Sequence, residues 1–589
     1  MSWEVWDMIL KTSFFNKGIY KSTIKRYLWG SLLYFVILFV STGLSVFLNV
    51  EQHFSDMPRD YYREYPLILN GVYMTVPILL ALVVPTVASL LVFRFVHSKK
   101  QAVFIHSLPV SRKANYVSSI LASFTLMLVP IIINTILLMF VSASGYSQYF
   151  TVRDCILWMS YNAFGVFLMF SVATFSSMVT GNGFAMVGIN VLVHAFLFIT
   201  VATLSVMADV FVYGFYNNSE IYDYLINNNF ATVVFGFMDK YFRRNITMVQ
   251  CIKHAVFAVT FYVGSYFIYS KRRIETAGDV AGFKCLNVIF KYLVTALATL
   301  FAFAVFADYI DENTFVFGVI IAIISVIVYA ACEMILKKTV NVLYSWKGYV
   351  GFAVFFIALT LTFSHTTFFG YETFVPEFEQ IEEAALYNYY HNGEPFTDRE
   401  DIVKMVADTH KELVSDIPKT SYENLYNTPY DSRIHIKYNL KNGKTVYRVY
   451  PVTYEQKVYV MNKFYEDDEY KMTCEQVFVE PSKVTGITVH NYNQKGYRDE
   501  YEIENYTQLL NAIKQDYLDM SYEQLYPYSL ENEDIIYEIS VQYLHDGGLD
   551  ENGERISYRN GVYINITEDY KQTIKWLESN GYKKVEDAQ

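Results

Sequence analysis

The sequence is poor in charged residues. Asp, Glu, Lys and Arg make up 18% of its 589 residues, whereas an average soluble protein contains about 25%. Apolar residues make up 53%, and up to about Phe369 they gather into runs of roughly twenty or more. Such runs are typical of membrane spans, so the composition excludes an ordinary soluble protein over this part of the chain.

Cysteine is also scarce, with five residues in the whole chain. Four of them lie in or beside apolar runs, where a small buried hydrophobe is the usual role: Cys155, Cys251, Cys285 and Cys332. Cys474 is the only cysteine beyond residue 370, so this part of the chain contains no internal disulfide. The spacing matches no zinc site.

The motifs of common catalytic sites are missing. No glycine-rich loop ends in Gly-Lys-Ser or Gly-Lys-Thr, so the chain has no standard cradle for nucleotide phosphates. A zincin His-Glu pattern and a nucleophile elbow are absent as well. We therefore expect a protein that is not an enzyme and that needs no cofactor or metal.

Nine apolar runs are present, each long enough to cross a hydrocarbon core of about 30 Å at about 1.5 Å per residue. The predicted spans are Gly30–Asn49, Gly71–Phe93, Asn115–Ser142, Cys155–Met178, Phe184–Val212, Cys251–Tyr269, Val288–Phe306, Phe315–Leu336 and Tyr349–Phe368.

The loops between the spans alternate in charge, and basic loops favour the cytoplasmic side. This rule places the basic N-terminus inside, together with Arg94–Lys113, Thr180–Asn182, Ser270–Lys284 and Leu336–Gly348. The tail after residue 369 then falls outside. One outer loop, Gly214–Gln250, disagrees, because it carries Lys240, Arg243 and Arg244. It also contains an apolar stretch, Phe230–Met238, that is predicted to dip back toward the bilayer.

The net charge of −11 combines two opposite halves. Residues 370–589 carry −19, which leaves +8 on residues 1–369. A basic membrane half and an acidic tail suit opposite sides of a membrane, and the acidity argues against nucleic acid as a partner.

The segment Arg94–Asn115 stands out among the inner loops. It is basic, it contains a small amphipathic piece over Ala102–His106, and Pro109 is expected to end any helix before it. We predict a short helix under the membrane that offers a mixed surface to something in the cytoplasm. The alternative is a basic loop that only sets the topology.

Four polar residues lie inside predicted spans: Asn134, Asn162, Asn190 and His194. They are candidates for a translocation path. The alternative is that they form hydrogen bonds between helices and hold the bundle together.

Residues 370–589 read as an α+β domain. Helices are predicted at Asp398–Val414, Tyr506–Leu518 and Glu568–Ser579. Asn442-Gly443 and Asn560-Gly561 each predict a hairpin turn. The acidic run Glu466–Glu469 is predicted to be a solvated loop.

Three segments together resemble the permease subunits of type-2 ABC transporters. SFFNKGIYKSTIKRYLW resembles the interfacial elbow helix that precedes the first span. HSLPVSR resembles the cytoplasmic element between spans two and three, and KRRIETAGD (Lys271–Asp279) resembles the segment after span six. The likeness covers about residues 1–279. The additional spans and the large tail are similar to Gram-positive bacterial permeases that carry a C-terminal extracytoplasmic domain of unknown function.

The resemblance implies a division into four parts. These are an elbow over residues 1–28, a six-span permease module over 29–280, three additional spans over 281–369 and an extracellular α+β domain over 370–589. It also implies that the loop between spans two and three is a coupling helix that docks on a cytoplasmic ATPase. The docking residues would be Phe104, His106, Leu108, Pro109, Ser111 and Arg112.

The function implied is a permease of the cell membrane that works with a separate ATPase and pairs with itself or with a second permease. Its cargo would be amphipathic, such as a peptide antibiotic, a lipid-like molecule or an envelope component. The alternative is a membrane sensor whose outer domain binds a ligand.

Overall fold

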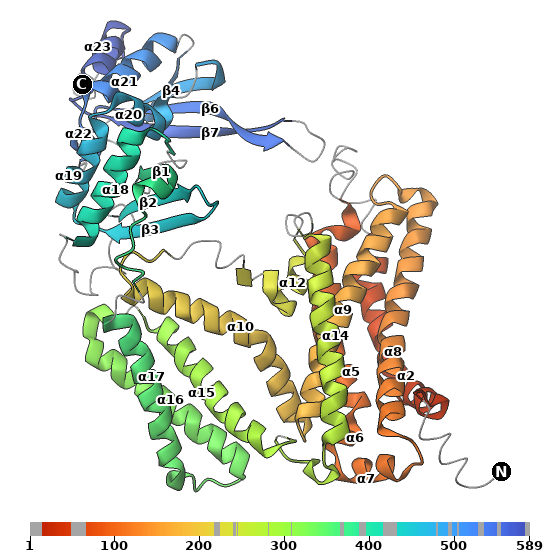
Figure 1. Cartoon of the computed structure of the whole chain (residues 1–589). Coiled ribbons are helices and arrows are strands. Elements are labelled where there is room, and N and C mark those ends of the chain that lie inside the picture. Colours follow the sequence, from red (N-terminus) through yellow and green to blue (C-terminus); the bar gives the residue numbers. More distant parts are fainter. Residues whose placement is uncertain are drawn as a thin grey trace. The chain divides into compact units, whose positions relative to one another are not determined.

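A computed structural model of the chain describes residues 14–48, 66–216, 224–225, 227–239, 243, 246–280, 282–307, 309–365, 370–387, 396–415, 433–478, 481–492, 498–503, 506–527, 535–549 and 555–582 (Figure 1). It divides into two compact units. The membrane unit comprises Met1–Met207, Asn217–Tyr309 and Asn313–Ala358. The C-terminal unit comprises Leu359–Gln589 together with Ala208–Tyr216 and Ile310–Glu312.

Among the described residues, nine helices are long and apolar enough to cross a membrane. They are Lys17–Leu48, Gly71–Val92, Arg112–Tyr146, Val152–Val179, Gly183–Phe211, Met248–Lys271, Leu286–Val305, Phe315–Lys337 and Trp346–Phe363. Each coincides with a predicted span, so the nine predicted runs are confirmed as helices. Their length and hydropathy indicate a multi-pass membrane protein.

The membrane unit is built of the following elements. They are α2 (Lys17–Leu38) with the π-helical turn Phe39–Leu44, α5 (Gly71–Val92), α6 (Arg94–His97), α7 (Lys99–Ser107), α8 (Arg112–Val141), α9 (Val152–Val179), α10 (Gly183–Phe211), α12 (Phe230–Gly236), α14 (Met248–Lys271), α15 (Lys284–Val305), α16 (Tyr309–Lys337) and α17 (Trp346–His365). Short turns lie at Leu67–Leu69, Ile274–Thr276 (η4) and Leu343–Ser345.

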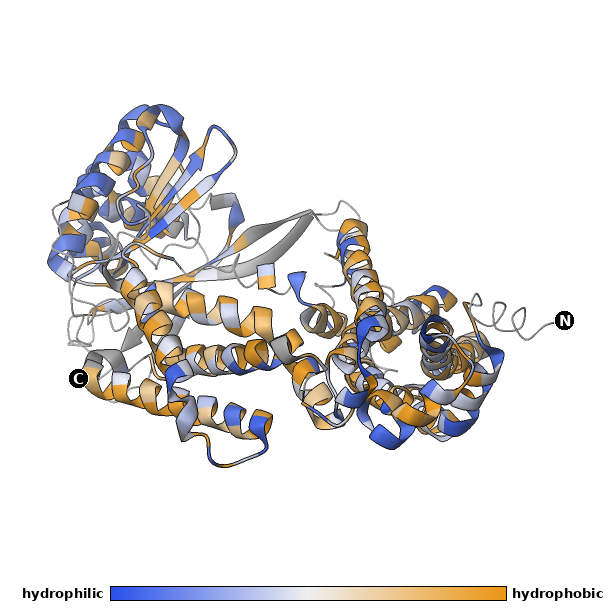
Figure 2. Cartoon of the chain, turned by 60° about the horizontal axis from the view of Figure 1, so that its bottom comes forward, coloured by the Kyte–Doolittle hydropathy of each residue, from blue (hydrophilic) through white to orange (hydrophobic). Residues whose placement is uncertain are grey.

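Helix α9 lies at the centre of the six-span part. It packs against α5, α14 and α8, and 56% of its apolar window is buried, against 17% for α14. Figure 2 shows hydrophobic residues along the length of the helices, and many of them are exposed, for example Val87, Val129 and Val256. A soluble bundle would carry charge on such exposed faces, so the pattern suits contact with lipid.

The predicted elbow is not separated from the first span. Helix α2 runs from Lys17 to Leu38 without interruption, and residues 1–13 lie outside the described residues. Asn16 caps the helix, because its side chain accepts a hydrogen bond from the Ile19 N–H at 3.0 Å.

The loops of the membrane unit form two groups that agree with the predicted alternation of sides. In the first group Arg112 contacts the end of α14, the Gly278 N–H donates to the Gly181 carbonyl, and Lys338 pairs with Asp279. These contacts join all four loops that the charge pattern places inside. In the second group the Leu67 N–H donates to the Tyr149 carbonyl at 3.0 Å. This bond joins the loop between spans one and two to the loop between spans three and four, both of which are predicted to lie outside.

The apolar stretch of the loop Gly214–Gln250 packs against the bundle as α12. Phe230, Val233 and Val234 are buried, and α12 packs on α5 and α9. The glycine at position 165 allows the close approach, because a Cβ there would lie 3.3 Å from a methyl group of Val234. Arg243 donates to the Phe237 carbonyl at the end of this helix, whereas Lys240 and Arg244 lie outside the described residues.

The C-terminal unit contains two antiparallel sheets. The three-stranded sheet has the order β1-β2-β3 and the four-stranded sheet the order β5-β4-β6-β7. The strands are β1 (Ile381–Tyr387), β2 (Arg433–Leu440), β3 (Thr445–Pro451), β4 (Val484–Tyr492), β5 (Arg498–Glu502), β6 (Tyr537–Leu549) and β7 (Arg555–Ile566). The helices are α18 (Glu400–Ser415), α19 (Tyr454–Tyr465), α20 (Asp468–Cys474), α21 (Thr507–Asp519), α22 (Tyr522–Leu525) and α23 (Lys571–Ser579). One hydrophobic core joins both sheets and these helices.

The three predicted helices of this domain correspond to α18, α21 and α23, and the turn at Asn442-Gly443 joins β2 to β3. The hairpin turn predicted at Asn560-Gly561 is wrong. Both residues lie inside β7, where Asn560 is paired with Tyr543 and Gly561 with Gln542 of β6. Gly443 has a φ of +78°, whereas Gly561 does not adopt the positive φ that this type of turn requires.

Candidate functional site

The first group of loops contains a short exposed helix, α7, held against the end of α14. We call this cluster the α7 junction. It comprises α7 itself, the linker Leu108–Arg112, and the segment Tyr269–Ala277 that ends α14 and forms η4.

The local sequence dictates where α7 ends. Leu108 is extended, with φ −70° and ψ 144°, because the ring of a following proline disfavours helical backbone in the residue before it. Helix α8 then begins at Arg112, and the Ser111 side chain accepts a hydrogen bond from the Ala114 N–H at 3.1 Å. The predicted short helix broken at Pro109 is therefore confirmed.

The outer face of α7 is apolar and exposed. Val103 is 65% exposed and Phe104 is 60% exposed, while Ala102 is buried on the opposite face. Beside this face lies an open groove of about 600 Å³, lined by Lys99, Val103, His106, Ser107, Ile274 and Glu275. Val103 therefore lines a groove with basic and acidic edges, and Phe104 is exposed on the same short helix.

Arg112 ties the start of α8 to the end of α14. Its Nη1 atom donates to three backbone carbonyl oxygens at the C-terminal end of α14, where carbonyls run short of helical partners. They belong to Tyr269, Ser270 and Arg272, at 3.1, 2.8 and 2.8 Å. The positive charge also complements the negative end of the α14 dipole.

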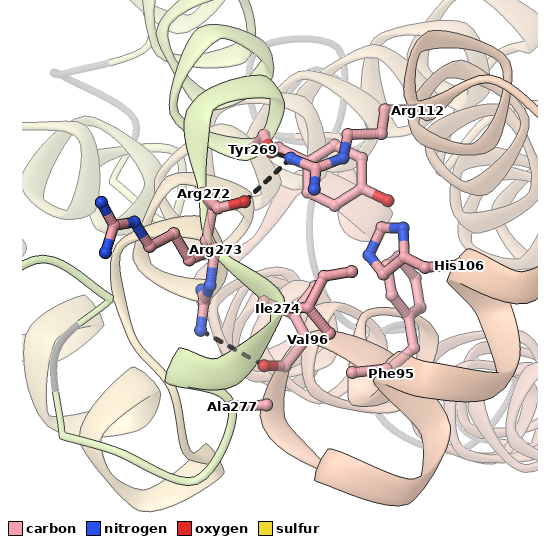
Figure 3. A pocket seen from close by; sticks show the side chains of 10 residues that line it. Phe95, Val96, His106, Arg112, Tyr269, Arg272, Arg273, Ile274 and Ala277 are labelled. Carbon is pink, nitrogen blue, oxygen red and sulfur yellow. Dashed lines mark hydrogen bonds between the residues drawn. The ribbon is translucent and has the colours of Figure 1, made fainter.

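The Tyr269 ring forms the centre of the junction. Figure 3 shows Arg112 and His106 beside it: the guanidinium carbon lies 5.9 Å from the ring centroid, and the imidazole centroid lies 6.0 Å away. Asn115 donates to the Tyr269 hydroxyl at 2.9 Å. Burial, and then the nearby Arg112 charge, lower the pKa of His106, so His106 is neutral at pH 7.

Arg272 ties the same junction to the end of α9. It is 6% exposed, and its guanidinium donates to the carbonyls of Met178, at 2.8 Å, and of Thr180 at that helix end. A further bond of 3.3 Å reaches the Val96 carbonyl, as Figure 3 shows. Burial lowers the pKa of Arg272 to about 10, so the group keeps its charge at neutral pH.

Close backbone contact completes the junction. The Gly278 N–H donates to the Gly181 carbonyl at 2.6 Å, and the Gly282 N–H donates to the Val179 carbonyl at 2.7 Å. A Cβ at position 181 would collide with the carbonyl oxygens of Thr276 and Asp279. Only glycine therefore fits at position 181 without a shift of the backbone.

The six residues predicted to dock a partner divide into two groups. Phe104 and Pro109 are exposed, and His106 and Leu108 are partly exposed, so these four can contact another protein. Ser111 and Arg112 are also partly exposed, but their side chains bond within the chain, as an N-cap and as a tie to α14. Sequence analysis missed Tyr269 and Arg272, because nothing in Lys271-Arg272-Arg273 marks the middle residue as buried.

The four polar residues predicted for a translocation path form bonds in different places. Asn134 donates to the Phe35 carbonyl of α2 at 3.4 Å, and Asn190 donates to the Thr86 hydroxyl of α5 at 2.9 Å. Asn162 bonds within its own helix, and the His194 carbonyl accepts from Asn229. For Asn134 and Asn190 these bonds match the predicted alternative, hydrogen bonding between helices.

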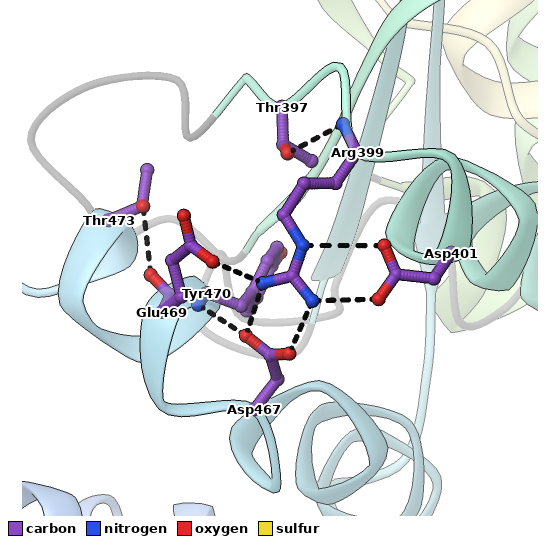
Figure 4. Close-up of polar contacts among 7 residues, drawn as sticks. All are labelled: Thr397, Arg399, Asp401, Asp467, Glu469, Tyr470 and Thr473. Carbon is purple, nitrogen blue, oxygen red and sulfur yellow. Dashed lines mark hydrogen bonds and ion pairs between the residues drawn. The ribbon is translucent and has the colours of Figure 1, made fainter.

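The C-terminal unit carries a second polar cluster, centred on Arg399 (Figure 4). Its guanidinium pairs with Asp401 and Asp467 at 2.7 Å and with Glu469 at 2.8 Å. Hydrogen bonds to Asp401 and Asp467 raise the pKa of Arg399. The prediction that Glu466–Glu469 is a solvated loop is confirmed only in part. Glu466, Asp468 and Glu469 are exposed, but Asp467 caps α20, which begins at Asp468, and also pairs with Arg399 next to the start of α18.

Among the described residues, no group of three or more His, Cys, Asp or Glu side chains is placed to hold a metal ion. Comparison of the chain with protein-family models, with curated proteins and with solved structures found no match.

Proposed function

We propose that this chain is the membrane-spanning permease subunit of an ATP-binding cassette transporter, and that a separate cytoplasmic ATPase docks on α7. The observation that carries the proposal is the α7 junction. A short helix exposes Val103 and Phe104 at the end of the bundle where the basic loops gather. Large apolar side chains that are exposed next to a groove are typical of a surface that binds another protein.

The bonds behind α7 suit the transmission of force. Arg112 holds the end of α14, and Arg272 holds the end of α9. Closure of an ATPase dimer against α7 would therefore act on two spans at once. Switching of access would then need a second membrane module, supplied by another copy of this chain or by a different permease, around amphipathic cargo.

The experiment places a photo-crosslinking amino acid at position 104 of the full chain in native membranes. The expected product is a crosslink to a protein that binds ATP. The matched control is the same amino acid at Met248, which is 79% exposed at the N-terminal end of α14 and is expected to give no such product. If position 104 captures no nucleotide-binding protein while the chain is folded, the proposal fails.

A single substitution adds a quantitative test. Phe104→Ser removes a side chain that is 60% exposed, so the stability of the chain is expected to stay within about 0.5 kcal/mol. Binding of the captured ATPase is expected to weaken by about 2 kcal/mol or more if Phe104 is a central contact. Arg112 is unsuitable for this purpose, because its loss would disturb the junction itself.

A membrane sensor is the alternative. The observation in its favour is that the C-terminal unit includes residues 208–216, which continue directly from a span. A sensor would respond to an outside ligand with no ATPase partner. Normal response in a cell that lacks the captured ATPase would favour the sensor over the permease.

A further inference from the structure

Residues 208–216 pack as part of the C-terminal unit, although about 140 residues separate them from its main part, Leu359–Gln589. We call these residues the strap. They comprise the last turn of α10 and the five residues that follow it. Tyr213 belongs to the hydrophobic core of the domain and is 6% exposed.

Tyr213 is anchored from two directions. Its ring centroid lies 5.0 Å from that of Tyr450 on β3, and its N–H donates to Glu372 Oε1 at 3.1 Å. Glu372 is itself buried and lies in the segment that follows the ninth span. The segment after the fifth span and the segment after the ninth span are therefore bonded to each other inside the domain.

The residue after Tyr213 must be glycine. Gly214 has a φ of +77°, and a Cβ there would lie 2.8 Å from Tyr450 Cε1. Its carbonyl accepts a hydrogen bond from the Val449 N–H at 3.3 Å. Since β3 is an edge strand of its sheet, the strap provides a hydrogen-bond partner for a backbone group on the open side of that strand.

Tyr213 and Tyr216, on either side of Gly214, pack against two tyrosines of β3. The Tyr216 ring centroid lies 4.1 Å from that of Tyr447, while Tyr213 lies against Tyr450. The Tyr450 hydroxyl bonds the buried His410 at 2.7 Å. The strap is thus connected through one ring to the interior of the domain.

We propose that the strap couples α10 to the C-terminal domain, so that a change in the packing of this span alters the edge strand β3, and the reverse. Helix α10 is continuous to Phe211, and the first anchor, Tyr213, follows only two residues later. A shift of the helix end therefore cannot be absorbed by slack chain. The inference holds for a permease and for a sensor alike, because it concerns a link within one chain.

Hydrogen–deuterium exchange of the full chain in lipid nanodiscs tests the link, with the β3 peptide as the readout and β6 as an internal reference. Gly214→Ala tests docking of the strap. Its matched control is Gly370→Ala, because Gly370 also has a positive φ, of +86°, but has open space at the Cβ position. Gly214→Ala is expected to accelerate exchange in β3 and Gly370→Ala is not.

Asn190→Leu then tests coupling from the membrane side. It removes the hydrogen bond of α10 to α5 and is expected to accelerate exchange in β3 about five-fold or more. The matched control, Asn134→Leu, removes a bond of 3.4 Å from α8 to α2 and is expected to leave exchange in β3 unchanged.

Three results would overturn the proposal. Unchanged β3 exchange in Gly214→Ala would mean that the strap does not dock. Unchanged β3 exchange in Asn190→Leu would mean that the strap is docked but transmits nothing. Equal acceleration in β3 and β6 would mean that the domain opens as a whole, not through the strap.

Discussion

His410 shows how one side chain can make a domain sensitive to pH. It is fully buried in α18, and its two ring nitrogens lie 3.0 Å and 2.7 Å from the hydroxyls of Tyr438 and Tyr450. Burial, and then the nearby Arg448 charge, lower the pKa of His410 to about 3. The unfolded chain binds a proton at this residue near pH 6.5, whereas the folded domain does not.

The sign of the effect follows from this difference. The contribution of neutral His410 to the free energy of unfolding is complete above about pH 6.5. It is lost as the pH falls toward about 3, because the unfolded chain then binds a proton that the folded domain does not. Between pH 7.5 and pH 5 the domain is expected to lose about 2 kcal/mol of unfolding free energy through His410. Urea midpoints at the two pH values, read from the accessibility of the buried Cys474 thiol, measure this loss.

His410→Gln serves as the comparison, because it keeps a polar side chain but does not titrate. Its midpoint is expected to be lower at pH 7.5 and to change less between the two pH values. The same pH dependence in the variant as in the parent chain would rule out His410 as the cause.

Single residues were the hardest to predict from the sequence. Arg399 meets Asp467 across 68 positions, and Arg272 differs from its neighbours Lys271 and Arg273 only in being buried. Basic or acidic composition indicates where charge lies along the chain, but not which charge faces inward. That choice depends on contacts between segments far apart in sequence, which no local pattern encodes.

Helices and strands were predicted far better than single contacts, because apolar runs and proline determine secondary structure from the local sequence. All nine apolar runs are helices, and α7 ends just before Pro109 as expected. The Asn-Gly pairs show the limit of such signals. Asn442-Gly443 forms its turn, while Asn560-Gly561 continues as strand because β6 supplies a partner along its whole length.

At the scale of elements, Arg112 is expected to hold α7 in place. Arg112→Gln removes a charge that caps three carbonyls of α14, so exchange of the amides in α7 is expected to rise about ten-fold, which corresponds to about 1.4 kcal/mol. Deuterium uptake by residues 99–107 measures this. Arg94→Gln is the matched control, because Arg94 is exposed at a nearby position, and a similar rise in that variant would contradict the role of Arg112.

At the scale of the whole molecule, the two groups of loops are predicted to face opposite sides of the membrane. The loops gather into two groups, and the basic group is expected to face the cytoplasm. Ser107→Cys and Ser144→Cys place thiols on exposed positions of the two groups. An impermeant reagent is expected to label position 144 in intact cells and position 107 only after permeabilisation.

The reverse pattern would place the C-terminal domain inside the cell and remove the basis for an ATPase at α7. Labelling of both positions in intact cells would contradict the alternation of the spans. A reporter fused after Gln589 gives an independent answer for the tail.

The composition of the C-terminal unit was not predictable at all. The charge and hydropathy of residues 370–589 suggested a self-contained domain, yet residues 208–216 supply part of its core. They sit at the end of an apolar run and carry no sign of their partner. The interaction depends on Tyr450, which is more than 200 positions away.

This discontinuity has a consequence for biosynthesis. The ribosome makes residues 208–216 long before β3, and four predicted spans emerge between them. Because both parts are needed for the core, the domain cannot close while those spans are still being inserted. The domain would then fold only in a chain whose later spans have been inserted correctly. If one of these four spans failed to insert, Tyr213 and β3 would lie on opposite sides of the bilayer.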